Sequence, residues 1–192
     1  MTKATIFGDG NMGTAIAGVL TQGGAAVEHI TTADQGGATV AGDLVILAVP
    51  YPALDAITAA YGDQLAGKVV VDITNPVNFE TFDSLTVPAG SSAAAELAAK
   101  LPSARVVKAF NTNFAATLAS KSVGDQPATV LIAGDDADAK STLADALAAG
   151  GVQAVDAGAL DRARELEALG FLQLTLAATE KTSWTGGFAL VG

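Results

Sequence analysis

The stretch Ile6–Gly18, "IFGDGNMGTAIAG", decides the fold because it spaces three glycines as GxGxxG between an apolar run and an alanine-rich segment. The run 4–8 predicts a strand, and the segment after the glycines predicts a helix. In that context Gly8 permits a tight turn, Gly10 lets a pyrophosphate approach the backbone, and Gly13 lets the helix pack close to the strand. Backbone N–H groups and the helix dipole then favour an anion. The spacing predicts a dinucleotide site, although three glycines alone could mark only a turn.

Short apolar runs alternate with helix-forming stretches along the whole chain. The runs that predict strands are 4–8, 25–31, 43–50, 68–74, 104–110, 128–134 and 152–158. The stretches that predict helices are 11–24, 52–61, 91–101, 113–120, 136–149 and 160–181. This alternation predicts an α/β fold with a Rossmann-type, doubly wound, mostly parallel sheet and helices on both faces. We expect a single domain over 1–192, in which 159–192 form a long C-terminal helix and a tail.

Two connections depart from the usual pattern. Only residues 32–42 separate the second and third predicted strands, which is too few for a helix and another strand. The first crossover is therefore trimmed, and one edge of the sheet is expected to be shorter than usual. The irregular stretch 75–90 is the longest loop, and loops of that size in compact domains are more often functional than idle.

Composition excludes several classes of function. The formal net charge is -10, with ten basic residues among twenty acidic ones, which disfavours nucleic acid and anionic membrane surfaces. There is no cysteine and the only histidine is His29, so disulfides, thiol catalysis and multi-histidine or thiolate metal sites are excluded. No apolar run reaches the length of a membrane span, and no N-terminal signal is visible. We expect a cytoplasmic protein without metal, nucleic-acid or membrane partners.

The turn after the second predicted strand bears on the choice between NAD and NADP. It reads "HITTAD" over 29–34. An acid at the strand end would hold the ribose 2′-hydroxyl of NAD, but Thr31 and Thr32 carry hydroxyls that could hydrogen-bond a 2′-phosphate. Asp34 lies just past the turn, and no Lys or Arg is present to pair with a phosphate. The turn favours NADP and leaves NAD open; His29 is either an ordinary strand residue or a nearby cation.

Polar and aromatic residues follow the other predicted strands. Ligands in open parallel sheets bind at the carboxyl ends of the strands. The residues at those ends are Pro50, Tyr51, Thr74, Asn75, Phe110 and Asn111. The segment "NPVN" could be only a turn. Lys108 is unusual in a buried strand unless it has a partner, so a functional role is favoured.

The segment "RARELE" places acids and bases at helical spacing. Arg162 can pair with Glu165, and Arg164 with Glu167, on a solvated or interface face of the last helix. The apolar face of that helix predicts a homodimer. Trp184 in the glycine-bearing tail, like Phe188, is expected to cover a core or a partner subunit rather than to touch a cofactor.

Six segments occur in a characteristic order: "IFGDGNMG", "LAVPYPA", "VVDITNPVN", "SSAAAELAAKLP", "VVKAFNTNFAATL" and "DAGALDRARELEALGFLQLTLA". Together they resemble the family of deazaflavin-coenzyme (F420):NADP oxidoreductases, and they are also similar to the reductase domains of the STEAP-type membrane metalloreductases. The resemblance runs nearly end to end, and "VKAFN" and "RARELE" discriminate better than the glycines. It is strongest to short dinucleotide-binding oxidoreductases that share the trimmed crossover.

The resemblance implies where a dinucleotide would lie. The pyrophosphate turn would hold Gly8, Asp9, Gly10, Asn11, Met12 and Gly13. The adenosine ribose or its phosphate would meet Thr31 and Thr32, and the adenine side would meet Ala48, Val49, Pro50 and Tyr51. Asn75 and Pro76 would lie near the nicotinamide. The wall where the nicotinamide meets a second, flavin-like ring would comprise Lys108, Ala109, Phe110 and Asn111. The family usually has a basic residue where this chain has Ala33, which puts the NADP preference in question.

These observations favour an NAD(P)H-dependent oxidoreductase that passes hydride between nicotinamide and a flavin-like or deazaflavin acceptor. The cofactors carry such chemistry while the protein aligns the rings and excludes water, so no catalytic residue is assigned. Two alternatives stay open. One is an NADP-dependent dehydrogenase of a small carbonyl or imine substrate, and the other is a nucleotide-binding module without turnover. The acceptor could be a deazaflavin, FMN, FAD or a chelated metal ion.

Overall fold

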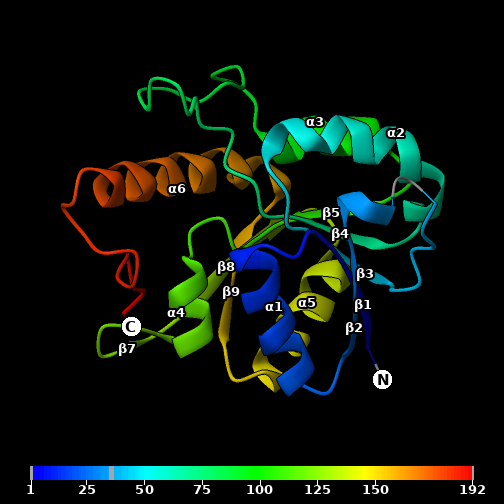
Figure 1. Cartoon of the computed structure of the whole chain (residues 1–192), viewed down its shortest axis with the longest axis horizontal. Coiled ribbons are helices and arrows are strands. Elements are labelled where there is room, and N and C mark those ends of the chain that lie inside the picture. Colours follow the sequence, from blue (N-terminus) through cyan, green and yellow to red (C-terminus); the bar gives the residue numbers. More distant parts are fainter. Residues whose placement is uncertain (1, 35–36, 192) are drawn as a thin grey trace.

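The computed structural model describes residues 2–34 and 37–191, and a seven-stranded sheet forms its centre (Figure 1). The strands are β1 (Lys3–Phe7), β2 (Ala26–Ile30), β3 (Leu44–Leu47), β4 (Val69–Asp72), β5 (Arg105–Lys108), β8 (Thr129–Gly134) and β9 (Gln153–Gly158). The helices are α1 (Asn11–Gln22), α2 (Leu54–Leu65), α3 (Ala93–Lys100), α4 (Ala115–Ser120), α5 (Ala137–Ala149) and α6 (Ala163–Ala178). Every predicted strand and helix forms, within a few residues of its expected bounds.

The sheet has the order β2-β1-β3-β4-β5-β8-β9 and is parallel at every junction except that between β5 and β8. The predicted Rossmann-type, mostly parallel sheet is therefore confirmed. Two features were not predicted. A small antiparallel pair, β6 (Ser122–Val123) and β7 (Gln126–Pro127), lies between α4 and β8, and a 3₁₀ turn over Leu160–Arg162 precedes the long C-terminal helix.

The trimmed first crossover is also confirmed. β2 forms one edge of the sheet and pairs only with β1, whose other neighbour is β3. In the described part of the connection from β2 to β3, the only regular element is a 3₁₀ turn over Thr32–Asp34. In this edge strand, three of the five residues are exposed.

Two apolar clusters, one on each face of the sheet, hold the layers together. The four residues of β3 are all buried and alternate between the clusters: Leu44 and Ile46 face one side, Val45 and Leu47 the other. The first cluster packs against α1, α4 and α5, and the second packs against α2, α3 and the start of α6 (Figure 1). Burial on both faces explains why the central strands read as continuous apolar runs.

The loop over 75–90 leaves the carboxyl end of β4 and extends beyond α3 and α6 in Figure 1. It contains one isolated bridge between Val77 and Leu85. The ring of Phe79 packs edge-on against that of Phe82, with the ring centroids 5.4 Å apart. None of the helices in the described ranges is long and apolar enough to cross a bilayer.

Candidate nucleotide-binding site

The three glycines of the first turn meet different demands. Gly8 has a φ of +97°, and a β-carbon there would lie 2.3 Å from the carbonyl oxygen of Ala48. A β-carbon on Gly13 would lie 2.6 Å from the carbonyl oxygen of Gly8. The fold itself therefore requires both glycines. At Gly10 a β-carbon would meet nothing within 4 Å, and the φ of -67° suits any L-residue. Only a ligand close to the backbone would require glycine at that position.

The N-terminus of α1 is open to an anion. Gly10 is its N-cap and supplies no side-chain cap. By contrast, Ser92 caps α3 by accepting from the amide of Ala95, and Asp136 caps α5 by accepting from the amide of Ala139. Uncapped N–H groups at a helix N-terminus are satisfied by water or by an anionic ligand. The residues present therefore fit a pyrophosphate across this turn.

A cavity of about 570 Å³ extends from the glycine turn along the carboxyl ends of β1, β2 and β3 to α2. It brings together many predicted site residues, namely Gly8, Asp9, Gly10, Thr31, Thr32, Ala48, Val49 and Pro50. Its far wall is an apolar face of α2 that includes Ile57 and Tyr61, which the sequence reading missed. The signal was present, since Ala53, Ile57, Ala60 and Tyr61 recur at helical spacing.

A second cavity, of about 410 Å³, lies on the other side of the same turn. It collects the predicted residues Asn11, Met12, Asn75, Phe110 and Asn111. Because Gly10 lines the first cavity and the next two residues line the second, a single extended ligand can cross the turn and occupy both. We refer to them below as the adenosine-side and nicotinamide-side cavities, after the parts of a dinucleotide that the sequence resemblance would place there.

Two asparagines are locked together at the nicotinamide-side cavity. The Asn75 amide donates to the carbonyl of Asn111 at 2.8 Å, and the Asn111 amide donates to Asn75 Oδ1 at 2.9 Å and to the carbonyl of Leu166 at 2.8 Å. Helix α6 approaches so closely that a β-carbon on Gly170 would lie 2.4 Å from Asn75 Oδ1. The pair is thus fixed by the C-terminal helix.

Two carbonyl oxygens in that cavity wall have no hydrogen-bond donor among the described residues. They are Oδ1 of Asn111 and Oδ1 of Asn113, and both side chains are more than nine-tenths buried. Buried acceptors in proteins are nearly always paired, so their partner is expected to be a water or a ligand N–H group. The sequence reading missed Asn113, which lies three residues beyond the predicted strand end.

The structure places Trp184 on the outer wall of the nicotinamide-side cavity. Its ring packs against Phe114, with centroids 5.0 Å apart, and its other surface leaves the residue 52% exposed. Gln173 ties the tail to this region, since it donates to the carbonyl of Thr112 at 3.1 Å and accepts from the amide of Phe188 at 3.1 Å. Trp184 therefore covers the site itself, which the sequence did not predict.

Lys108 and Ala109 line neither cavity, although the resemblance had implied that they form the pocket wall. Lys108 is fully buried, and its ammonium group lies 2.8 Å from Asp72 Oδ2 and 2.7 Å from Glu167 Oε1. It also donates to the carbonyl of Thr74 at 2.5 Å. Ala109 belongs to the apolar core. The lysine thus has the partner that a buried position requires, and that partner is internal.

Tyr51 and Pro76 also line neither cavity. The Tyr51 hydroxyl donates to Glu96 Oε2 at 2.5 Å, and burial together with this hydrogen bond raises the pKa of Tyr51. The carbonyl of Pro76 accepts from the amide and hydroxyl of Thr86, which closes the base of the 75–90 loop. Both residues support the strand ends without lining the adjoining cavities.

The "RARELE" segment is corrected in part. Arg162 pairs with Glu165 at 3.5 Å as predicted, but Arg164 also pairs with Glu165, at 2.7 Å, and not with Glu167. Glu167 instead faces the sheet, on the buried side of α6 that Ala163 and Gly170 share at helical spacing. Its carboxylate accepts from the first amides of α3 as well as from Lys108, and burial raises the pKa of Glu167.

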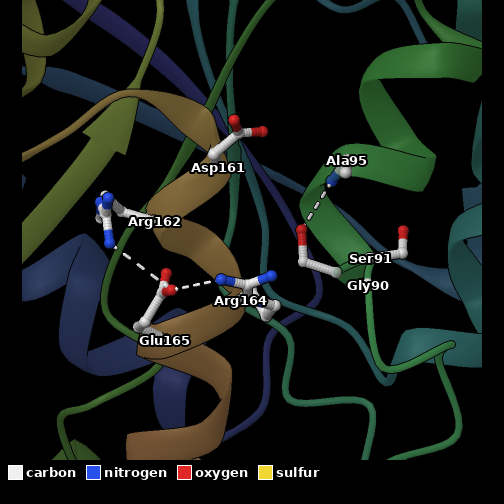
Figure 2. A pocket seen from close by; sticks show the side chains of 8 residues that line it. Gly90, Ser91, Ala95, Asp161, Arg162, Arg164 and Glu165 are labelled. Carbon is white, nitrogen blue, oxygen red and sulfur yellow. Dashed lines mark hydrogen bonds and ion pairs between the residues drawn. The ribbon is translucent and has the colours of Figure 1, made fainter.

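A third pocket, of about 230 Å³, lies between the start of α3 and the start of α6 (Figure 2). Figure 2 shows the side chains of Arg162 and Arg164 directed at Glu165. The amides at the start of α3 are already used, because Ser92 accepts from one and Glu167 from two. The start of α3 therefore does not offer these three amides to an anion in this pocket. No cluster of three or more metal-ligating side chains occurs in the described residues.

The glycine turn, the uncapped helix and the two cavities at the carboxyl edge of a parallel sheet define a Rossmann-type dinucleotide-binding fold. Residues 29–76 match the model of the family described as NADP oxidoreductase, coenzyme F420-dependent. The chain is 32% identical over 151 residues to the F420-dependent NADP reductase of Methanocaldococcus jannaschii, with 76% of this chain and 66% of that protein covered. It is 40% identical over 107 residues to metalloreductase STEAP3 of Rattus norvegicus, with 56% of this chain and 21% of that protein covered.

A crystal structure of a candidate F420-dependent NADP reductase from Arthrobacter sp. FB24 superimposes with a TM-score of 0.83 at 25% identity, and each chain is covered completely. The chain is thus related to the coenzyme F420-dependent NADP oxidoreductases, as the sequence resemblance predicted. It spans 21% of the STEAP3 sequence and 66% of the archaeal reductase.

Proposed function

We propose that the chain is an NAD(P)H-dependent oxidoreductase that transfers hydride between the nicotinamide and a flavin-like or deazaflavin acceptor. The observation that carries the proposal is the pair of cavities that meet at the glycine turn. One extended nucleotide can occupy both, and the names of its relatives specify NADP and F420. The bound cofactors supply the hydride donor and acceptor, so the protein needs no acid–base group of its own.

Different residues of the chain would hold different parts of the nucleotide. The uncapped start of α1 and the open space at Gly10 receive the pyrophosphate. Val49, Pro50 and Ile57 give the adenosine-side cavity apolar walls. At the other end, the free Oδ1 of Asn111 can accept from an amide N–H₂ such as that of nicotinamide. These contacts orient one face of the ring toward the open part of the cavity.

The acceptor is expected on the outer side of that cavity, between the nicotinamide and the tail. Trp184 offers the exposed part of an indole that Phe114 supports from behind. A planar conjugated ring gains by stacking on such a surface. Asn113 Oδ1 is a buried, unpaired acceptor suited to an N–H on the edge of a flavin or deazaflavin pyrimidine ring.

Truncating Trp184 tests this placement. The Trp184→Ala variant is expected to raise the KM for the deazaflavin or flavin acceptor at least tenfold, or about 1.4 kcal/mol, while the Kd for NADPH stays unchanged. NADPH oxidation is followed by its absorbance with deazaflavin, FMN, FAD and chelated ferric ion as acceptors. Phe79→Ala removes another exposed aromatic ring, one that lines neither cavity, and should leave both constants unchanged. An equal loss for nucleotide and acceptor, or activity confined to carbonyl substrates, would contradict the proposal.

We also propose that two copies associate through the exposed apolar residues of α6 and the tail, which are Leu172, Phe188, Leu190 and Val191. Exposed apolar patches of this kind commonly mark protein contacts. Light scattering should give twice the chain mass of 19.0 kDa, and a monomer would contradict this part of the proposal.

With a net charge of -10, we propose a cytoplasmic role without nucleic-acid or membrane partners.

A further inference from the structure

The turn after β2 contains a carboxylate in contact with Thr31, one of the two threonines expected to meet a 2′-phosphate. Asp34 Oδ2 accepts from the amide of Thr31 at 2.6 Å and from the Thr31 hydroxyl at 3.0 Å. Thr31 and Thr32 line the adenosine-side cavity. Both donors that Thr31 offers at this strand end are therefore already engaged. The same hydrogen bonds lower the pKa of Asp34, so its carboxylate is ionised near neutral pH.

The charges around this turn do not offset a phosphate. No Lys or Arg is among the described residues that line the adenosine-side cavity, and the one charged residue there is Asp9. His29 Nδ1 lies 2.9 Å from the carbonyl oxygen of Gly8. Because a carbonyl oxygen only accepts, Nδ1 donates this hydrogen bond. A 2′-phosphate brings close to two negative charges, whereas a ribose 2′-hydroxyl can donate to a carboxylate.

We propose that Asp34 is a nucleotide-selecting residue, which opposes the 2′-phosphate of NADP(H) and accepts the ribose 2′-hydroxyl of NAD(H). This rests on the proposed function, in that the dinucleotide must lie across the glycine turn with its adenosine ribose at Thr31. An incoming 2′-phosphate has to displace the carboxylate from Thr31 before it can use the amide and hydroxyl. The ratio of the two nucleotide affinities is then set by Asp34.

A local structural role makes a different prediction. Asp34 ends the 3₁₀ turn Thr32–Asp34, and the Thr31 hydroxyl also accepts from the amide of Ala33 at 3.3 Å. If the carboxylate only closed this turn, its removal would weaken NADPH and NADH binding by the same factor. Selection instead requires the two dissociation constants to move apart.

The test is calorimetric titration of NADPH and NADH into the full chain and its Asp34→Ala and Asp34→Asn variants. Asp34→Ala should lower the ratio of the NADPH Kd to the NADH Kd at least tenfold, because it removes the charge and frees both Thr31 donors. Asp34→Asn should give a smaller shift in the same direction, because the charge is lost while an acceptor for Thr31 remains. Asp145→Asn removes an equal charge from an exposed position on α5 and should leave the ratio unchanged.

An unchanged ratio in both Asp34 variants would overturn the assignment, even if the absolute affinities fall together. Binding of neither nucleotide to the unmodified chain would overturn the proposed function and, with it, this assignment. Thermal unfolding of each variant shows whether a fall in affinity reflects loss of the fold.

Discussion

Replacement of Gly10 by valine is expected to abolish dinucleotide binding and to leave the fold nearly intact. A β-carbon at Gly10 meets no protein atom within 4 Å, and the backbone conformation there is an ordinary one. The added side chain therefore fills only the space through which a pyrophosphate reaches the start of α1. The Kd for NADPH should rise at least about 100-fold, which corresponds to about 2.7 kcal/mol. The melting temperature should fall by no more than about 4 °C, the cost of a poor N-cap residue.

The neighbouring glycines provide the contrast. Gly18→Ala, on the same helix and also with open space at the β-carbon, should bind NADPH as the parent does. Gly8→Ala and Gly13→Ala would press a β-carbon against backbone oxygens, so both variants should be destabilised. A loss of NADPH binding in either variant would therefore not be specific to the site. A Gly10→Val variant that binds NADPH as tightly as the parent would show that no pyrophosphate lies on this turn.

Replacement of Lys108 by methionine is expected to give the largest loss of stability. The ammonium group lies between two buried carboxylates, those of Asp72 and Glu167, and its removal leaves both without their counter-charge. Breaking a buried ion pair from one side typically costs about 3–5 kcal/mol. For a chain of this size the melting temperature should fall by more than about 6 °C in thermal unfolding followed by circular dichroism.

Two further variants show whether charge is the cause. Adding Glu167→Gln to Lys108→Met should recover part of the loss, because one of the two uncompensated charges disappears. Lys100→Met removes a lysine that forms an ion pair with Asp55 at the surface, and the loss of that pair should cost less than about 1 kcal/mol. A Lys108→Met variant that keeps its stability but loses affinity for the acceptor or the nucleotide would contradict this account. It would show that Lys108 contributes to the pocket wall.

The fold could be predicted largely because its determinants are local. Continuous apolar runs mark strands buried on both faces, and the count of residues between the second and third runs is enough to show that the crossover is trimmed. The direction of β8, by contrast, could not be predicted from local sequence. It is set by a short antiparallel register in which Val107 faces Gly134 and Lys108 faces Ala133, and no periodicity in either strand records that pairing.

The candidate site could be predicted where it follows strand ends and not where it depends on distant segments. The residues after β1, β2 and β3 gather as expected, because parallel strands end at one edge. The partner of Lys108 comes from α6, and Trp184 reaches the nicotinamide-side cavity from the tail. The sequence placed Asp34 just past this turn. Its proposed role follows only from the hydrogen bond that its side chain accepts from the Thr31 amide. Such contacts arise from tertiary packing, which a single sequence does not display.

The most direct test of the central claim is to follow the hydride itself. The chain would be incubated with NADPH that carries deuterium at both C4 positions and with an oxidised deazaflavin, and the reduced acceptor would be analysed by mass spectrometry. Because the hydride-accepting atom of a deazaflavin is carbon, a transferred deuterium is retained. The account predicts one deuterium in each reduced acceptor and none when the Gly10→Val variant replaces the parent. Nucleotide that keeps both deuterium atoms in the presence of every flavin and deazaflavin, although NADPH binds, would contradict it.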